Sequence, residues 1–326
     1  MNREVAKKII SKYGIYFVLL FMVIAMSIFS DVFLTGRNLI SVIRQVSVIG
    51  LLSLGVTLVI ISKGIDLSSG SVLAFSAVMA ASFGQLITFA DKMYPGIGEL
   101  PVIVPLLVAL AVGTLCGIIN GALIAKTGIP AFIATLGMYT AARGAALLYT
   151  DGRPVSNLTD SYKWFGQGYV GFIPVPVLIY ILMAVITWVL LNHTRFGKNV
   201  YAIGGNIHAA EVSGINVHRN LIKIYAYAGL LSGLAGLVMS ARVDTGQPGM
   251  GMGYELDAIA ATTIGGTSHA GGIGTIGGAV VGLLILGVLN NGLNLLGVSA
   301  YWQQIIKGVI IVGAVVIDMR RNRVKK

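Results

Sequence analysis

Residues 200–215 read VYAIGGNIHAAEVSGI, a small and partly polar segment between two long apolar runs at 173–191 and 221–241. Asn206 can cap the start of a helix, and Gly214 can adopt the left-handed conformation that ends one. The pattern predicts a helix of about two turns. Its small residues would give a low-relief face that the groove of another protein could accept. A plain interfacial helix joining two membrane spans is the alternative.

The rest of the chain has the composition of a membrane protein. Of 326 residues, 56% are hydrophobic and only 11% are charged, and the mean hydropathy is +0.86. A helix crosses the roughly 30 Å hydrocarbon core with about 20 apolar residues. Runs of that kind lie near 15–34, 39–61, 66–88, 102–125, 130–149, 173–191, 221–241, 275–296 and 302–317. The shorter run 255–266 predicts a half-span. The composition therefore predicts an all-α polytopic membrane protein of about 8–10 transmembrane helices.

Positive charges predict the orientation, because Lys and Arg of short loops stay on the cytoplasmic side. With both termini in the cytoplasm, most of the 23 Lys and Arg residues fall inside. The outside set is then Arg37, Lys92, Arg153, Lys163 and Arg242. Three more, Arg44, Arg143 and Lys307, fall within predicted spans, where one of them is expected to pair with an acidic residue.

Two pairs of similar segments predict an internal repeat. Residues 50–62 (GLLSLGVTLVIIS) resemble 229–240 (GLLSGLAGLVMS), and the pair Asn120-Gly121 before GIPAF has a counterpart in Asn291-Gly292 before GVSAY. In the predicted orientation the related runs cross the membrane in opposite directions. This favours two inverted-repeat halves, with a substrate path at their interface near the membrane midplane.

Glycines at every fourth position form two predicted ridges, which allow helices to approach closely. They are Gly113, Gly117 and Gly121, and Gly274, Gly278 and Gly282. Packing within the chain is the favoured interpretation, and a subunit interface or a moving seam is the alternative.

Polar residues within the spans are candidates for a translocation path, because polar groups at membrane depth are costly. The candidates are Asp66, Ser68, Asn120, Glu255, Asp257, Asn290, Asn291 and Asn294. Serines, amides and helix ends suit a hydroxyl-rich solute. For Asp66, capping of the following helix is an alternative. For the asparagines, hydrogen bonding between helices is an alternative.

Motifs of soluble enzymes are missing from the sequence. It contains no G-x4-G-K-[ST] phosphate loop and no H-E-x-x-H or Ser/His/Asp arrangement. The histidines lack metal-ligand spacing. We therefore expect no catalytic residues, no metal and no cofactor in this chain. The net charge of +11 is interpreted as a topology signal with some affinity for anionic membrane lipids, and no nucleic-acid partner is expected.

Several blocks resemble the permease subunits of monosaccharide ABC importers, the ribose and galactose (methylgalactoside) group. They are TRFGKNVYAIGGNIHAAEVSGINV (194–217), GIDLSSGSVLA (64–74), GYELDAIAATTIGGTSHAGGIGT (253–275), NNGLNLLGVSAYWQQIIKG (290–308) and DMRR (318–321). The resemblance extends from about residue 35 to 320. It implies an ABC importer permease fold, with one transmembrane permease domain over 1–326 and a cytoplasmic coupling loop at 192–220.

The resemblance also implies the partners of such a subunit in the bacterial inner membrane. Two permease chains, most simply a homodimer, would form the pore. A separate cytoplasmic ATPase would use ATP and Mg, and a periplasmic or lipid-anchored sugar-binding protein would deliver the substrate. The helix that seats in the ATPase would then comprise Gly204, Gly205, Asn206, Ala209, Ala210, Glu211, Ser213 and Gly214.

The substrate is less sharply indicated than the family. LNNGLNLLGVSAY and GYELDAIAA are most similar to ribose permeases, whereas NHTRFGKNVYAIGGN, YWQQIIKG and KYGIYFVLL are similar to the galactose type. Segments 242–254 and 262–278 match neither type throughout. Ribose is favoured, with galactose next. The rival class is a self-sufficient secondary transporter or channel for a small polar solute, with Asp66 or Asp257 as its proton or sodium site.

Overall fold

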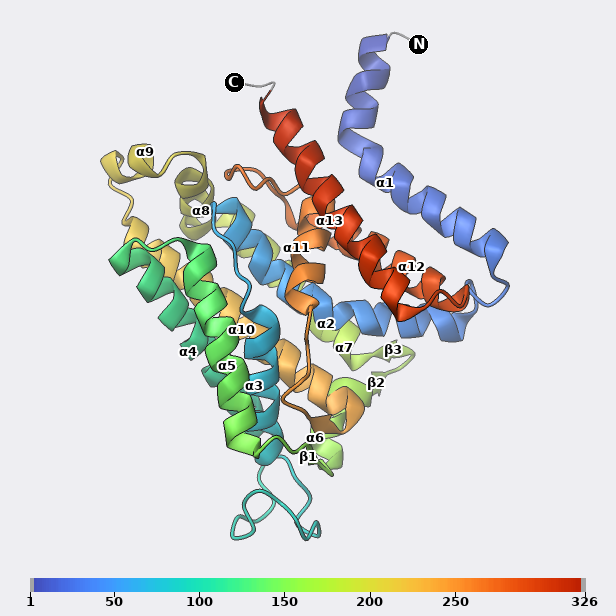
Figure 1. The fold of residues 1–326 in the computed structure, drawn as a ribbon, viewed down its shortest axis with the longest axis vertical. Helices are drawn as coiled ribbons and strands as arrows, with labels where there is room; N and C mark the ends of the chain where they lie inside the picture. The colour runs from blue at the N-terminus through green and yellow to red at the C-terminus, as the bar shows by residue number, and fades with distance from the viewer. Residues whose placement is uncertain (1–2, 324–326) are drawn as a thin grey trace.

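The structure, a computed structural model, describes residues 3–323 and is almost entirely helical (Figure 1). Its helices are α1 (Arg3–Phe29), α2 (Gly36–Ile61), α3 (Ser69–Ser82), α4 (Ile103–Thr127), α5 (Ala131–Thr150), α6 (Asp160–Gln167), α7 (Val175–His193), α8 (Arg195–Gly205), α9 (Ile207–Val212), α10 (Val217–Val243), α11 (Tyr254–Ile264), α12 (Ile276–Leu295) and α13 (Ala300–Arg323). Two short antiparallel pairs join β1 (Val155–Ser156) to β4 (Thr245–Gly246) and β2 (Tyr169–Val170) to β3 (Ile173–Pro174).

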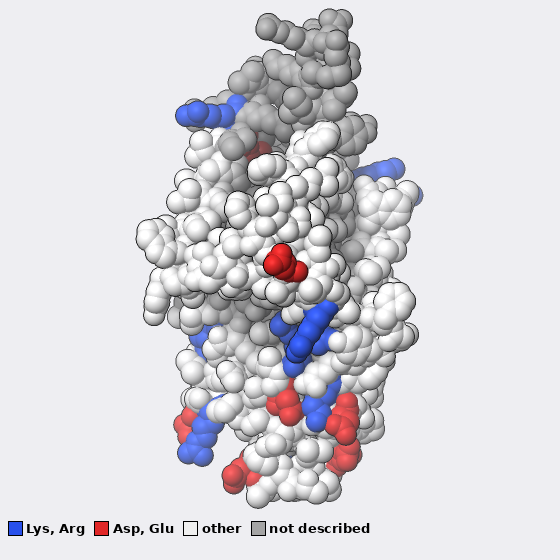
Figure 2. All heavy atoms as spheres, turned by 90° about the vertical axis from the view of Figure 1, so that its right-hand side faces the viewer, with Lys and Arg blue, Asp and Glu red and all other residues white. Residues whose placement is uncertain are grey.

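The polytopic α-helical architecture predicted from the sequence is confirmed. Within the described residues, seven helices are long and apolar enough to cross a membrane, namely α2, α4, α5, α7, α10, α12 and α13. The apolar part of α1, Gly14–Phe29, and α3 are shorter. On the face in Figure 2, charged side chains are sparse above the centre, an acidic residue lies near the centre with basic residues just below it, and more charged residues gather toward the lower part. Charged side chains are costly in a hydrocarbon layer, so the part above the centre is the one suited to it.

Two of the membrane elements are too short to cross. The predicted half-span is α11, whose 11 residues extend about 17 Å at 1.5 Å per residue. The predicted run 66–88 is helical only over α3, with 14 residues. Residues 64–68 before α3 are not helical, because the chain turns back there after α2. The Asp66 carboxylate accepts a hydrogen bond from the backbone N–H of Ser68 in this turn.

The first helix of each half packs mainly against helices of the other half. Helix α2 packs against α10, α11 and α12, whereas α10 packs against α2, α3 and α4. Helix α3 is covered by α4 and α5, and α11 is covered in the same way by α12 and α13. The correspondence of α2–α5 with α10–α13 is the arrangement that the predicted inverted repeat requires.

Both predicted glycine ridges pack within the chain. On α4, Gly113, Gly117 and Gly121 lie against the backbone of α10, so that a Cβ on any of them would overlap it. On α12, Gly278 and Gly282 lie in the same way against the backbone at the end of α11. The third predicted member, Gly274, lies before α12 begins and faces the side chains of Ile61 and Thr267, so it is not part of this ridge. Close backbone approach maximises van der Waals contact where lipid supplies no hydrophobic drive.

The ends of the chain share one side of the molecule. Figure 1 shows the start of α1, the end of α13 and α9 together toward the upper part, whereas the connection between α3 and α4 lies at the lower tip. The core between these ends is centred on α2, whose residues 46–61 are all buried. Helix α2 is therefore a helix surrounded by protein rather than by lipid.

Candidate functional site

The quoted segment forms two short helices, α8 and α9, joined at Asn206. The Asn206 side chain accepts a hydrogen bond from the Ala209 N–H at 3.0 Å, which caps α9. At the other end Gly214 has φ +82°, and the N–H of Ile215 donates to the Ala210 carbonyl at 3.0 Å. This hydrogen bond and that from Gly214 N to Glu211 O form a Schellman motif. Both predicted ends of α9 are thus confirmed, and α8 is an additional helix that the sequence did not predict.

Helix α9 has one buried and one exposed side. Ala210 is buried, at 3% exposure, against Ile203 and Val217. Val212 is 91% exposed, and Ala209, Glu211 and Ser213 are exposed as well. The expected low-relief face therefore lacks Ala210, because that side chain closes the turn onto α8 and α10. The exposed side of α9 also contains an apolar residue, Val212, which is not among the predicted site residues.

The end of α8 is fixed by backbone contacts that only glycine permits. A Cβ on Gly204 would overlap the carbonyl oxygen of Ile61, the last residue of α2. The same oxygen accepts a hydrogen bond of 2.8 Å from the N–H of Gly272, in the connection between α11 and α12. The α8–α9 segment, α2 and the 265–275 connection therefore meet at one point. The α8–α9 segment therefore contacts both halves of the repeat at this point.

The first group of predicted path residues surrounds the start of α3. The Asp66 carboxylate accepts hydrogen bonds from the Ser68 N–H at 2.8 Å and from the Ser68 hydroxyl at 2.6 Å. The Asn120 amide in turn donates to the Ser68 hydroxyl at 2.9 Å. All three residues are buried. Asp66 therefore holds Ser68, the residue before α3, and does not cap the N–H groups of α3 itself. The cluster joins α3 to α4.

Glu255 lies at the start of α11 and faces the start of α3. A Cβ on Gly70 would overlap its carboxylate and the Gly251 carbonyl. Arg143 of α5 donates to the carbonyls of Pro248 and, at 2.8 Å, of Met250. The half-helices α3 and α11 thus meet end to end around buried polar groups, which is how transporters arrange discontinuous helices.

The second group surrounds α12. Lys307 of α13 donates to the Asp257 carboxylate at 3.0 Å, so Lys307 is the intramembrane cation with an acidic partner that the sequence analysis expected. Asp257 and Asn290 border a common small hollow. The predicted asparagine cluster is divided, because the next two amides have partners on other helices.

Asn291 and Asn294 hold helices together, as the alternative interpretation stated. Asn291 and Asn38 of α2 exchange two hydrogen bonds of 2.9 Å. Asn294 accepts from the Gln303 amide of α13 at 2.8 Å. The sequence analysis missed Asn38 and Gln303, and no local pattern marks them, since their partners lie on other helices.

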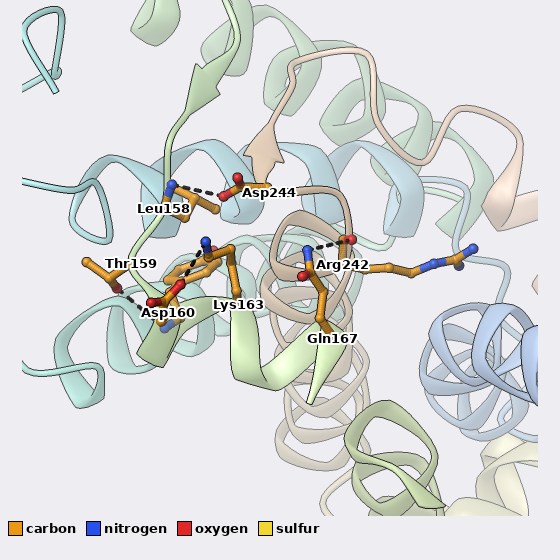
Figure 3. A network of polar contacts seen from close by, with 8 residues as sticks. Leu158, Thr159, Asp160, Lys163, Gln167, Arg242 and Asp244 are labelled. Atoms are coloured by element: carbon orange, nitrogen blue, oxygen red, sulfur yellow. Dashed lines mark hydrogen bonds and ion pairs between the residues drawn. The ribbon is translucent and has the colours of Figure 1, made fainter. Parts of the chain in front are cut away.

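Opposite α9, the far end of α10 is held by a small polar network (Figure 3). The Asp244 carboxylate accepts from the Leu158 N–H at 3.0 Å, and the Gln167 amide donates to the Arg242 carbonyl at 3.2 Å. The Arg242 side chain points away from this network in Figure 3. An exposed pair of 2.8 Å joins Lys163 to Asp160 and lowers the pKa of that carboxyl. The network joins α6 to α10.

Comparison with known proteins assigns this architecture to a family. Residues 38–315 match the family described as the permease component of the branched-chain amino acid transport system. The chain belongs to this permease family. The match starts at α2 and ends within α13, and so includes both halves of the repeat and the α8–α9 segment.

Individual members of this permease family are similar over nearly the full chain. The ribose import permease RbsC of Bacillus subtilis is 45% identical over 316 residues, covering 96% of this chain and 94% of that protein. RbsC of Escherichia coli K12 is 45% identical over 308 residues, with 93% and 92% coverage. The galactose/methyl galactoside import permease MglC of E. coli K12 is 40% identical over 334 residues, with 100% and 99% coverage. No solved structure matches this chain.

Proposed function

We propose that this protein is the transmembrane permease subunit of an ATP-binding-cassette importer for a monosaccharide, with ribose favoured over galactose. The observation that carries the proposal is the 45% and 40% identity, over nearly the whole chain, to permeases named for ribose and for galactose. The wording of the family description mentions branched-chain amino acids. The sugar permeases outweigh it because they are 45% identical over 96% and 93% of this chain.

The partners follow from the same proposal. A separate ATPase binds the exposed side of α9, a sugar-binding protein delivers substrate at the opposite end, and a second copy of this chain completes the pore. The side of the molecule with α9 faces the cytoplasm of a bacterium, together with both chain ends. The contacts of Gly204 and Gly272 with Ile61 support the assignment of α9 as the ATPase-binding helix, because they connect the α8–α9 segment to both halves of the repeat.

Transport then proceeds by alternating access. Closure of the ATPase on ATP moves α9, and the two permease chains change between outward-open and inward-open arrangements. Each arrangement must bind its partners with different affinity, because only differential binding shifts an equilibrium between states. This chain contributes positioning and a path, and ATP with its Mg is bound by the partner.

The contacts of the intramembrane acids count against a self-sufficient ion-coupled transporter. Asp66 accepts two hydrogen bonds from Ser68, and Asp257 is paired with Lys307. Both carboxylates proposed as proton or sodium sites in that alternative therefore have structural partners.

Substitutions on the two sides of α9 test the proposal. Val212→Glu places a charge on the exposed side, so we expect the assembled ATPase and the sugar uptake of the variant to fall at least tenfold while membrane insertion is unchanged. Ala210→Glu buries a charge and is expected to destabilise the segment itself. Co-purification of the ATPase with tagged full-length chain, and uptake of labelled ribose and galactose, are the measurements.

Phe172→Glu is the matched control, because Phe172 is 82% exposed and lies in the β2–β3 turn. It should retain the ATPase. Normal ATPase recovery and normal uptake in Val212→Glu would contradict the assignment of α9.

A further inference from the structure

A small hollow lies between α2, α11 and α12, and both polar and apolar side chains line it. Gln45, Asp257 and Asn290 contribute polar groups from the three helices, and Val46, Ile49 and Leu283 are among the apolar residues. The space available is on the order of one water molecule. Amide and carboxylate groups from separate helices thus converge beside an apolar wall.

The hydrogen bonding of the hollow is incomplete. Asn290 Oδ1 is buried and has no hydrogen-bond partner among the described residues, although its neighbour Asn291 is fully paired with Asn38. An unsatisfied buried acceptor costs about 1–3 kcal/mol. Asn120 Oδ1 is also unpartnered, but the other end of that amide is bonded within the cluster at α3. Asn290 Oδ1 thus lacks a partner among the described residues and lies in a residue that lines the hollow.

Helix α13 lies outside this region and has no buried residue in its 18-residue membrane-spanning window. It packs mainly against α11, and Lys307 is its polar contact with Asp257. Lys307 is 27% exposed in its side chain, whereas Asp257 is 10% exposed. A donor that approaches through the hollow reaches the Asp257 carboxylate in competition with the Lys307 ammonium group.

We propose that Asp257, Asn290 and Gln45 form a hydroxyl-binding station for the transported monosaccharide. Sugar hydroxyls donate to the Asp257 carboxylate and to Asn290 Oδ1, and they accept from the Gln45 amide. The apolar wall contacts the C–H groups of the ring, as small-molecule sites combine apolar surface with a few polar groups. In this structure the hollow is too small for a sugar ring. The ring enters when α13 separates from α11. This inference rests on the proposed function.

Uptake by the complete importer, with its ATPase and binding protein, tests the station. We expect Asn290→Leu and Asp257→Asn to lower the initial rate of labelled ribose uptake at least tenfold, with the amount of assembled complex unchanged for Asn290→Leu. Gln304→Leu is the matched amide control, because Gln304 is exposed on α13. It should transport at close to the wild-type rate.

A charge exchange separates the station from a purely structural ion pair. Asp257→Asn leaves Lys307 uncompensated and can impair folding. The double variant Asp257→Lys with Lys307→Asp restores an ion pair but moves the carboxylate to α13. The station predicts recovered assembly without recovered uptake, whereas recovered uptake would overturn it.

Labelling gives a readout that does not depend on transport rates. In a Cys116→Ala background, Val46→Cys, which lines the hollow and leaves the three polar residues intact, is treated with a methanethiosulfonate reagent during turnover, with and without ribose. We expect ribose to slow labelling several-fold at this position and not in Gln304→Cys. Unprotected labelling in an importer that transports ribose refutes the station and leaves the proposed function intact. If the wild-type importer takes up neither ribose nor galactose, the proposed function itself fails, and the station falls with it.

Discussion

The contacts of α4 with α10 and those of α13 with α11 hold helices together in opposite ways. Along the first, Gly113, Gly117 and Gly121 bring two backbones into direct contact. Along the second, a side-chain ion pair between Lys307 and Asp257 is the main polar link, and α13 has no buried residue in its 18-residue membrane-spanning window. Backbone contact resists any sliding, whereas a long side chain adapts to movement. The contact between α4 and α10, called the seam below, is therefore rigid, whereas the contact between α13 and α11 can adapt.

The largest effect is expected from breaking the rigid seam. Gly117→Val would drive a side chain into the Tyr225 carbonyl of α10, so we expect the variant to lose at least about 3 kcal/mol of stability, or to fail to assemble. Thermal unfolding of the detergent-purified protein measures this loss.

Gly137→Val on α5 is the control for that experiment, since nothing lies within 4 Å of a Cβ built there. Equal stability of the two variants would mean that the seam does not depend on backbone contact.

A smaller effect is expected at the far end of α13. The Asp318 carboxylate accepts hydrogen bonds of 3.1 Å from the Ser268 hydroxyl and from the His269 N–H. Asp318→Ala removes charged acceptors and should cost about 1–3 kcal/mol. Hydrogen exchange should accelerate in the 265–275 connection and not along α4 and α10.

Asp160→Ala, which removes an exposed carboxylate of the Lys163 pair, should leave this exchange unchanged. Acceleration spread evenly over the whole protein would show that α13 and the seam unfold together.

The smallest effect concerns pH. Burial lowers the pKa of His269, and the nearby Asp318 opposes that shift to a lesser extent. The fold thus prefers neutral His269. Its contribution to stability is present above the ordinary pKa near 6.5 and is lost as the pH falls through the lowered value. The thermal midpoint should fall slightly between pH 7.5 and 5.5. His269→Gln should reduce this dependence, and a midpoint that rises on acidification would contradict it.

The rigid features were predictable because their signals are local. Membrane spans follow from length and apolarity, and the ridge of α4 follows from glycines at every fourth position. The ends of α9 follow from Asn206 and Gly214, whose side chain and backbone freedom act within a few residues. The inverted repeat was visible because each half retains similar segments.

The adaptable features depend on contacts between distant segments. Nothing near Lys307 indicates that Asp257 is its partner, and the burial of Ala210 depends on packing against α8 and α10. Helix α8 was missed because its sequence, RFGKNVYAIGG, is short, rich in glycine and only moderately apolar. Which of the asparagines in α12 have hydrogen-bond partners likewise depends on the neighbouring helices and cannot be predicted from the sequence alone.

The exchange of partners between the halves has a consequence for the order of synthesis. Helix α3 is almost entirely buried, and a large part of its cover is α10, which begins only at Val217. Until α10 leaves the ribosome, the buried face of α3 and the glycines of α4 lack the helix against which they pack. A chain stopped after α7 would leave these faces without their close helix–helix contacts in the bilayer. The first half of the protein must therefore wait for the second before either is complete.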